Sequence, residues 1–418
     1  MTMSLAQEQQ LENAYVMSTF ARKPVELVRG EGMYAFDTEG KAYLDFIAGI
    51  GVVSLGHCHP ALVEALCAQA AKLIHVGNYY YIENRGEVAK MLSGLLNGEG
   101  ADGAVPGAAT GPGQAPAPWK TFFANSGAEA NECAIKLARA FAKDAGRPGR
   151  TIITLDQSFH GRTLAALAAT GQPAKQEAFQ PLPAGFIHTP PNDVEALEGI
   201  FRREGDTVCA IMVECVQGES GVHPCSREFL EAAQGLAHEC GALLICDEVQ
   251  TGIYRCGKRP FAFQRFGIEP DIVTIAKGVA SGVPTGMCAA RAEVAQALGP
   301  GDHGSTFGGS NLAMAAAKTT LETVADPSFG ESVEEAGAYL RERLSRLPHV
   351  QEVRGLGLMC GCDLGDGLSA FEAVDRGLEE GLLLNATGPK TLRFLPPLVC
   401  GKQHVDELAE GLQRVLRP

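Results

Sequence analysis

The chain has 418 residues, a formal net charge of −14 at pH 7 and an isoelectric point near 5.2. This length is typical of one large domain with a smaller one. The acidic balance excludes the clustered Lys and Arg that bind nucleic-acid phosphates, so we expect no nucleic-acid partner. No run of about 18 apolar residues occurs and the start has no basic, apolar leader, so we expect no membrane partner and a cytoplasmic protein. The 13 cysteines are scattered, which favours free thiols in a reducing compartment.

The first part of the chain, residues 1–58, is rich in predicted strands and turns, and we expect it to pack with a small C-terminal domain. Residues 59–309 form the expected large domain. Within it, the segment 97–118 is mostly Gly, Ala and Pro. Such a segment has too few large apolar side chains to pack, so it predicts a mobile surface insertion.

From about residue 120, short apolar runs alternate with amphipathic helical patterns. Because the runs are continuously apolar, they predict strands that are buried on both faces. Two helical stripes, over 130–141 and 229–240, lie between them. This alternation is typical of an α/β fold with a mainly parallel sheet. The predicted strands cover residues 120–125, 151–155, 208–214, 242–247, 271–276 and 286–290.

After about residue 310 the pattern changes. Long amphipathic stretches over 311–325, 331–347 and 404–416 predict helices, and short strands are expected near 350–363 and 391–395. Residues 310–418 therefore predict a smaller α+β domain.

Two ionisable residues stand at the ends of predicted buried strands. Lys277 ends the apolar run 271–276, and Asp247 ends the run that begins at Ala242. A buried ammonium must be paired or lose its charge, so a lysine at this position suggests chemistry. The carboxyl ends of parallel strands meet at one edge, so this amine and this acid are expected to face one crevice. The alternatives are a snorkelling lysine and an acid that caps a helix.

Six motifs occur in order along the chain, and together they resemble the class III, pyridoxal-phosphate-dependent aminotransferases of fold type I. The resemblance runs from Tyr15 to about Arg417, apart from 97–118, and is greatest to the acetylornithine enzymes. The motifs are Gly56-His-Cys-His-Pro60, Asn125-Ser-Gly-Ala-Glu-Ala-Asn131, Phe159-His-Gly-Arg-Thr163, Asp247-Glu-Val-Gln-Thr-Gly252, Ala276-Lys-Gly278 and His303-Gly-Ser-Thr-Phe-Gly308.

The resemblance implies pyridoxal 5′-phosphate as the cofactor and a role for each residue of these motifs. Lys277 is implied as the catalytic lysine that holds the cofactor as a Schiff base and shuttles the proton. Asp247 is the implied catalytic partner of the pyridine nitrogen. The remaining implied cofactor-binding residues are Ser126, Gly127, Ala128 and Thr306 for the phosphate, Phe159 and Val249 for the ring faces, and Gln250 for the phenolic oxygen.

The implied substrates are N2-acetylornithine, as in arginine biosynthesis, and 2-oxoglutarate. Arg162 is implied to hold the substrate α-carboxylate. Glu219 and Arg393 resemble the pair in which the glutamate masks the arginine until a dicarboxylate binds; the alternative is a surface ion pair. Ser305 and Tyr81 complete the implied substrate site, with Tyr80 as the alternative to Tyr81.

Thr306 reaches the site from the other subunit in this family, which implies a homodimer with shared active sites. Several other readings stay open. The amino donor could be ornithine, 4-aminobutyrate, succinylornithine or succinyldiaminopimelate, and an aminomutase or racemase uses the same cofactor apparatus. A non-enzymatic or nucleotide-binding role is the most distant alternative. The closely spaced His57 and His59 favour a structural turn, and we expect no metal site.

Overall fold

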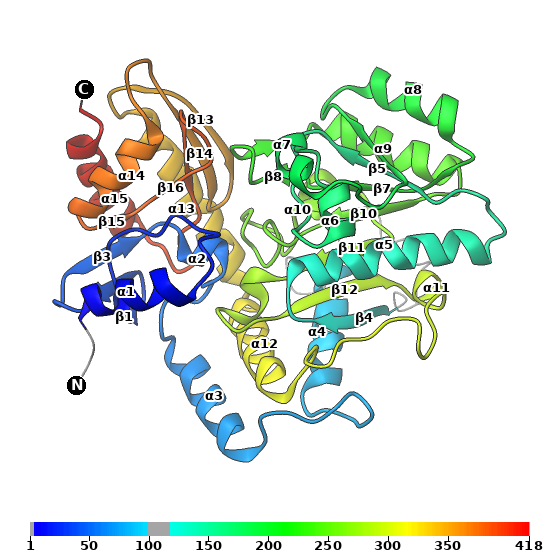
Figure 1. Cartoon of the computed structure of the whole chain (residues 1–418), viewed down its shortest axis with the longest axis horizontal. Coiled ribbons are helices and arrows are strands. Elements are labelled where there is room, and N and C mark those ends of the chain that lie inside the picture. Colours follow the sequence, from blue (N-terminus) through cyan, green and yellow to red (C-terminus); the bar gives the residue numbers. More distant parts are fainter. Residues whose placement is uncertain (1–3, 99–117, 418) are drawn as a thin grey trace.

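The computed structural model describes residues 4–98 and 118–417. Figure 1 shows two lobes, one built around a large sheet and the other from elements of both ends of the chain. Most of the predicted insertion, residues 99–117, lies outside the described residues. The domain boundaries predicted at 58/59 and 309/310 stay predictions.

The large lobe is built on a 7-stranded sheet. Its strands follow the order β4-β12-β11-β10-β7-β5-β6, and the neighbours from β11 to β6 pair in parallel. The prediction of a mainly parallel sheet is therefore confirmed. The bounds are β4 (Trp119–Ala124), β12 (Gly286–Arg291), β11 (Ile272–Ile275), β10 (Leu243–Asp247), β7 (Val208–Val213), β5 (Thr151–Leu155) and β6 (Phe186–Thr189).

Both faces of this sheet are covered, as the continuous apolar runs predicted. In β10, Leu243 and Ile245 belong to the core on one face, whereas Leu244 and Cys246 belong to the core on the other. Successive side chains of a strand point to opposite faces, so each face needs its own helical layer. One layer contains α5 (Gly127–Asp144), α6 (Leu164–Ala169) and α11 (Ala292–Ala295), and the other contains α4 (Arg85–Leu96), α8 (Val194–Glu204), α9 (Arg227–Glu239) and α12 (Asn311–Val324).

One strand of the large sheet runs against its neighbours. β12 is antiparallel to both β11 and β4, so it begins at the edge where the parallel strands end. Its first residue, Gly286, lies directly against Ser126, because a Cβ there would come within 2.1 Å of the Ser126 carbonyl oxygen. The start of β12 and the start of α5 are thus held together at this edge.

The smaller lobe contains an antiparallel sheet of order β13-β14-β17-β16, with three long helices beside it. The N-terminal strands form a second sheet in which β3 pairs in parallel with β15. The bounds are β13 (Val350–Leu356), β14 (Met359–Leu364), β17 (Thr391–Phe394), β16 (Asn385–Ala386), β15 (Leu382–Leu383), β1 (Leu27–Glu31), β2 (Tyr34–Asp37), β3 (Ala42–Asp45), α13 (Pro327–Ser345), α14 (Ala370–Glu379) and α15 (Lys402–Val415).

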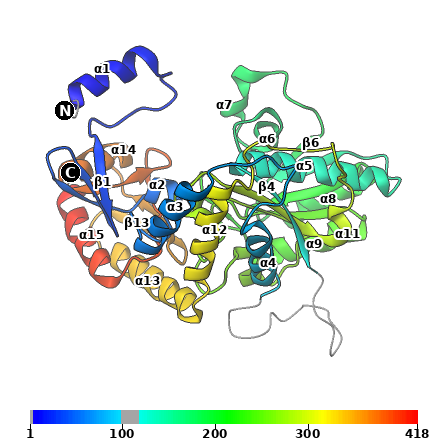
Figure 2. The ribbon, with the colours of Figure 1, turned by 90° about the horizontal axis from the view of Figure 1, so that it is seen from below.

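The other elements are short or peripheral. Viewed from below, α1 stands at the outer end of the smaller lobe, away from the large sheet (Figure 2). Among the described residues, no helix has the length and apolarity that crossing a membrane requires. The remaining bounds are α1 (Leu5–Tyr15), α2 (Ala48–Gly51), α3 (Pro60–Lys72), α7 (Pro173–Gln176), η1 (Glu177–Phe179), β8 (Val216–Gln217), β9 (His223–Pro224), α10 (Ala262–Phe266) and η2 (Lys277–Ala280).

Candidate active site

A cavity of about 430 Å³ lies at the carboxyl edge of the large sheet. Its walls come from the loops that follow β4, β5, β7, β10 and β11, and from the segment that leads into β12. Clefts at the carboxyl ends of strands are the usual binding places of open α/β sheets. Lys277 and Asp247 both line it, as their positions at strand ends predicted.

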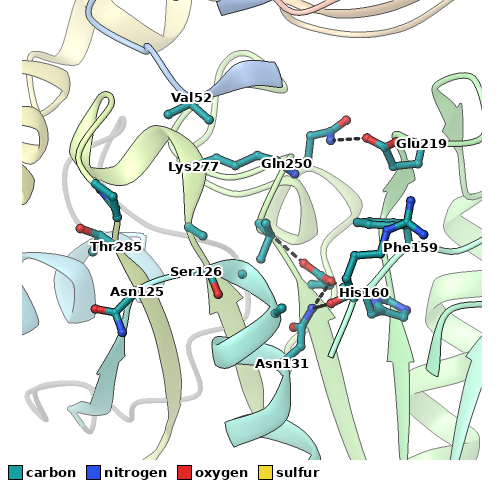
Figure 3. Close-up of a pocket in the computed structure, with 18 of the residues that line it drawn as sticks. Val52, Asn125, Ser126, Asn131, Phe159, His160, Glu219, Gln250, Lys277 and Thr285 are labelled. Carbon is teal, nitrogen blue, oxygen red and sulfur yellow. Dashed lines mark hydrogen bonds and ion pairs between the residues drawn. The ribbon is translucent and has the colours of Figure 1, made fainter. Parts of the chain in front are cut away.

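Lys277 lies two residues after the end of β11 and extends across the cavity toward Gln250 (Figure 3). Its backbone has φ of +47°, a conformation that costs a non-glycine residue free energy. Burial lowers the pKa of Lys277, and the nearby charge of Arg393 adds to this, while the carboxylates of Glu219 and Asp247 partly oppose it. The amine is thereby brought closer to its neutral, nucleophilic form.

The Asp247 carboxylate is held by three N–H donors. Asn131 Nδ2 donates to Asp247 Oδ2 at 2.8 Å, and the backbone N–H of Val249 donates to Oδ1 at 3.0 Å. His160 Nδ1 lies 2.8 Å from the same Oδ2. An acid with this many donors is fixed in orientation, which a partner for a cofactor atom requires.

A second acid, Glu214, lines the cavity beside this group. Burial raises its pKa to about 7, and the charge of Asp247 adds to the rise while His160 opposes it. Burial alone would lower the pKa of His160, but its hydrogen bond to Asp247 and the charges of both acids outweigh it and raise the pKa. Two acids and an imidazole thus influence one another's charge at one wall of the cavity.

The N-terminus of α5 opens onto the cavity. Ser126 is its N-cap, and the Ser126 hydroxyl accepts the N–H of Glu129 at 3.2 Å. The N–H groups of Gly127 and Ala128 belong to the first turn, where helices have no internal acceptor for them. Gly127 is required by close packing, because a Cβ there would come within 2.6 Å of Val249 Cγ1. This turn is a ready site for a phosphate.

Phe159 lines the cavity, and Arg162 lies over its ring, with the guanidinium carbon 5.4 Å from the ring centroid. Lys175 Nζ lies 5.9 Å from the same centroid. Arg162 is exposed and has no ion pair or hydrogen bond to any residue in the described part of the chain. An unpaired guanidinium at the mouth of a cavity is suited to a carboxylate ligand.

Glu219 and Arg393 form an ion pair at the far side of the cavity. Arg393 Nη1 donates to Glu219 Oε1 at 2.6 Å, and Arg393 Nε donates to Asn385 Oδ1 at 3.0 Å. Because Arg393 is only 2% exposed, the alternative of a surface ion pair is wrong. Although burial alone would raise the pKa of Glu219, Arg393 outweighs it and lowers the pKa.

Four predicted site residues do not line this cavity within one chain. Arg393 is one of them and reaches the cavity only through Glu219, its partner, which does line it. Ser305 lies at its edge, since Asn125, which does line the cavity, donates from Nδ2 to Ser305 Oγ at 3.0 Å. Thr306 lines a different hollow, next to residues 77–79. Tyr81 is fully exposed, with a relative accessibility of 103%, and so is not brought to the cavity by its own chain.

Some cavity residues were not singled out from the sequence. His160 and Asn131 stand inside the quoted motifs, but only packing brings them to Asp247. Glu214 follows the end of β7 just as Asp247 ends β10, so the rule of acids at strand ends could have found it. Thr285, which precedes β12, lines the cavity with a buried hydroxyl that lacks a partner among the described residues.

The family comparison matches residues 17–416 to the class-III aminotransferases. The chain is 47% identical to the acetylornithine aminotransferase of Caldanaerobacter subterraneus, covering 97% of this chain and 98% of that protein. It is 45% identical to the Methanocaldococcus jannaschii acetylornithine aminotransferase, covering 97% and 96%. Among solved structures, the acetylornithine aminotransferase of Elizabethkingia anophelis has a TM-score of 0.83 at 30% identity, covering 99% of each chain.

The cavity fits pyridoxal 5′-phosphate, the cofactor implied by the sequence. The first turn of α5 presents N–H donors suited to the phosphate. Asp247 is an acid already oriented by Asn131, His160 and the Val249 N–H. Lys277 is an amine whose pKa is lowered at the same cavity. These three groups match the three reactive or charged parts of the cofactor: its phosphate, its ring nitrogen and its aldehyde.

Proposed function

The chain belongs to the class-III aminotransferases, and from this premise we propose that it moves the terminal amino group of N2-acetylornithine to 2-oxoglutarate. The observation that best supports transamination as the reaction class is that Lys277 and Asp247 line the same cavity. The choice of donor is supported by the acetylornithine aminotransferases that are 47% and 45% identical over nearly the whole chain.

When bound, the cofactor supplies an aldehyde that takes up the amino group and a ring that withdraws electrons from the substrate carbon. Lys277 would hold the cofactor through its aldehyde, and its amine, when free, would move a proton to and from the substrate carbon. Asp247 keeps a proton at the ring nitrogen. Asn131 and His160 fix the direction in which the Asp247 carboxylate points.

The other cavity residues position the cofactor. The N–H groups of Gly127 and Ala128, with the Ser126 cap, bind the phosphate. Phe159 and Val249 pack on the ring faces, and Gln250 donates to the phenolic oxygen.

The two substrates differ in charge at one end, and the Glu219–Arg393 pair distinguishes them. Arg162 binds a carboxylate of either substrate at the cavity mouth. When the ω-amino donor binds, Glu219 covers Arg393, as it does in the structure at 2.6 Å. When 2-oxoglutarate binds, its second carboxylate displaces Glu219 and pairs with Arg393. A single site thereby accepts a monocarboxylate donor and a dicarboxylate acceptor.

We further propose a homodimer in which Thr306, Ser305 and Tyr81 serve the partner's site. The loops around Tyr81 and Thr306 lie together, because Asn78 Nδ2 donates to the Ser305 carbonyl oxygen at 2.7 Å and the rings of His75 and Phe307 are 5.3 Å apart. They expose several large apolar side chains, as an interface would. These are Leu73, Ile74, Tyr79, Tyr80, Tyr81 and Phe307.

A spectroscopic half-reaction screen tests the donor. The cofactor-loaded protein is mixed with N2-acetylornithine, ornithine, 4-aminobutyrate, succinylornithine or succinyldiaminopimelate, and the loss of the cofactor's visible band is followed. Of the five donors, N2-acetylornithine is expected to give the highest ratio of rate constant to KM. Faster conversion of any other donor overturns the donor assignment but leaves the reaction class standing. A protein that binds no cofactor overturns both.

A further inference from the structure

A second cavity, of about 240 Å³, lies on the face of the sheet that α5 covers. Its lining includes two cysteines from different elements, Cys133 of α5 and Cys288 of β12, together with His303. None of the three lines the active-site cavity. Both cysteines are almost completely buried, at 1% and 2% exposure, so the cavity is the route by which a small solute reaches them.

The fold brings the three side chains together by a chain of contacts. Cys288 stands opposite Phe122 in the β12–β4 pairing, and the Phe122 ring lies 4.6 Å from the His303 ring between centroids. Lys136 is three residues after Cys133 in α5, so the two share one face of the helix. Lys136 Nζ lies 3.2 Å from His303 Nδ1.

Lys136 and the His303 ring thus lie together beside Cys133. The Cys133 thiolate is stabilised by hydrogen bonds from the Cys288 thiol and from His303, which lower the Cys133 pKa to about 6, with the charges of His303 and Lys136 adding to the effect. The same bond raises the pKa of Cys288. One sulfur is therefore a nucleophile at neutral pH and the other a protonated thiol in contact with it.

The protein contains a second pair of thiols that are hydrogen-bonded to each other but lie in a different environment. Cys215 and Cys246 are hydrogen-bonded to each other and fully buried. The pKa of both is raised, and neither lines any of the cavities described above. In the described part of the chain, no group of three or more His, Cys, Asp or Glu is arranged to hold a metal ion, so the Cys133 cluster is not a metal centre.

We propose that Cys133 and Cys288 are a peroxide-reactive dithiol that closes to a disulfide between α5 and β12. The Cys133 thiolate attacks one oxygen of the hydroperoxide, which breaks the O–O bond and leaves Cys133 as a sulfenic acid with release of hydroxide. The Cys288 thiol then attacks the Cys133 sulfur, and its proton leaves with the departing hydroxyl as water. Two thiols are oxidised, and one hydrogen peroxide is reduced to two waters.

Peptide mapping of the cofactor-loaded protein tests this site. The protein is treated at pH 7 with a few equivalents of hydrogen peroxide, denatured, alkylated and digested. A disulfide-linked pair of peptides carrying Cys133 and Cys288 is expected, and dithiothreitol should remove it. Cys215 and Cys246 should be recovered fully alkylated. Disulfide formation should be about tenfold slower in Lys136→Met, because the thiolate loses a stabilising charge.

Matched variants complete the test. Cys133→Ser should form no linked peptide, whereas Cys209→Ser should behave as the wild type, because Cys209 lies in the same core but burial raises its pKa to about 11. The proposal is overturned if both thiols of the pair stay alkylatable after peroxide, if Cys133 is oxidised to sulfinic acid without a linked peptide, or if Cys215–Cys246 oxidises at the same rate.

Discussion

Arg393 Nη1 donates to Glu219 Oε1 at 2.6 Å and to the Gly218 carbonyl oxygen at 3.1 Å, and has a longer contact of 3.4 Å with Gln250 Oε1. Its Nε donates to Asn385, so Nε and Nη1 are both engaged before any substrate arrives. Glu219 is the more exposed partner, with 26% of its side chain accessible against 3% for Arg393. The carboxylate is therefore the member of the pair that can move away, and the arginine the one that stays.

Arg393→Ala is expected to slow the two half-reactions to different extents. Loss of one member of a buried charge pair costs about 2–5 kcal/mol, so the half-reaction with 2-oxoglutarate should slow by about 100-fold. The donor half-reaction should change by only a few-fold. Single-turnover rates of the two half-reactions measure the ratio directly.

Arg354→Ala is the matched control for this ratio. Arg354 donates to Asp363 Oδ2 at 2.6 Å in the same small sheet, but Asp363, unlike Glu219, does not line the cavity. The Arg354→Ala variant should leave the ratio of the rates of the two half-reactions unchanged. An equal loss of both rates in Arg393→Ala would contradict the assignment of the pair to the acceptor.

Lys277→Ala should remove the covalent link to the cofactor. Reduction of the loaded wild type with borohydride should add the cofactor mass to the peptide that contains Lys277, and the variant should gain no mass at any lysine. Its transamination rate should fall by at least about 10⁴-fold, the upper range for loss of an acid–base group. Lys175→Ala serves as the control, because Lys175 lies beside Phe159, which lines the same cavity as Lys277, and its loss should leave the labelling intact.

The pH dependence of cofactor attachment should reflect the lowered pKa of Lys277. Only the neutral amine attacks an aldehyde, so the attachment rate rises with pH through the lysine pKa. Since burial lowers that pKa, the midpoint should lie below about 10.4, the value of an ordinary lysine. Stopped-flow absorption of the stripped protein mixed with cofactor gives the midpoint. A midpoint at or above that of an ordinary lysine would show that the amine is not desolvated.

Glu248 should make the fold less stable as the pH rises. Its carboxylate accepts the N–H groups of Ala262 and Phe263 at 3.0 and 2.8 Å, yet burial raises its pKa to about 7. An unfolded glutamate titrates near 4.3, so the folded state binds more protons between those values. The stability from this group is present below pH 4.3 and falls by about 3 kcal/mol as the pH rises through 7.

Thermal unfolding of the wild type and of Glu248→Gln from pH 5 to 8 measures this contribution. The amide cannot ionise, so the Tm of the variant relative to that of the wild type should increase with pH. A difference in Tm that is constant across this range would mean that Glu248 titrates outside it.

The sequence predicted every strand of the large sheet except β6, because continuous apolar runs have few alternatives to double burial, whereas the residues of the edge strand β6 are only partly buried apart from Thr189. The run from Ala242 and the run 271–276 placed Asp247 and Lys277 at one edge, and the structure brings both to one cavity. Family membership and the cofactor are likewise confirmed. The roles of the individual residues stay predictions.

Contacts that depend on packing between distant elements could not be read from the sequence. Asn131 meets Asp247 across 116 positions of the chain, and His160 reaches the same oxygen across 87. Contacts between residues so far apart in the sequence do not follow from helical or strand periodicity. Tyr81 and Thr306 show a second limit, because their own chain does not bring them to the cavity and their role at a partner's site stays a proposal.

The reversed direction of β12 has a consequence for how this site can change. Because β12 begins at the edge where β11 ends, the connection 276–285 starts and finishes at the cavity, and Lys277 and Thr285 both belong to it. A parallel β12 would need a crossover of a dozen or more residues to the opposite edge. The loop can therefore gain or lose residues without moving a strand, which lets the pocket wall vary while Lys277 stays in place.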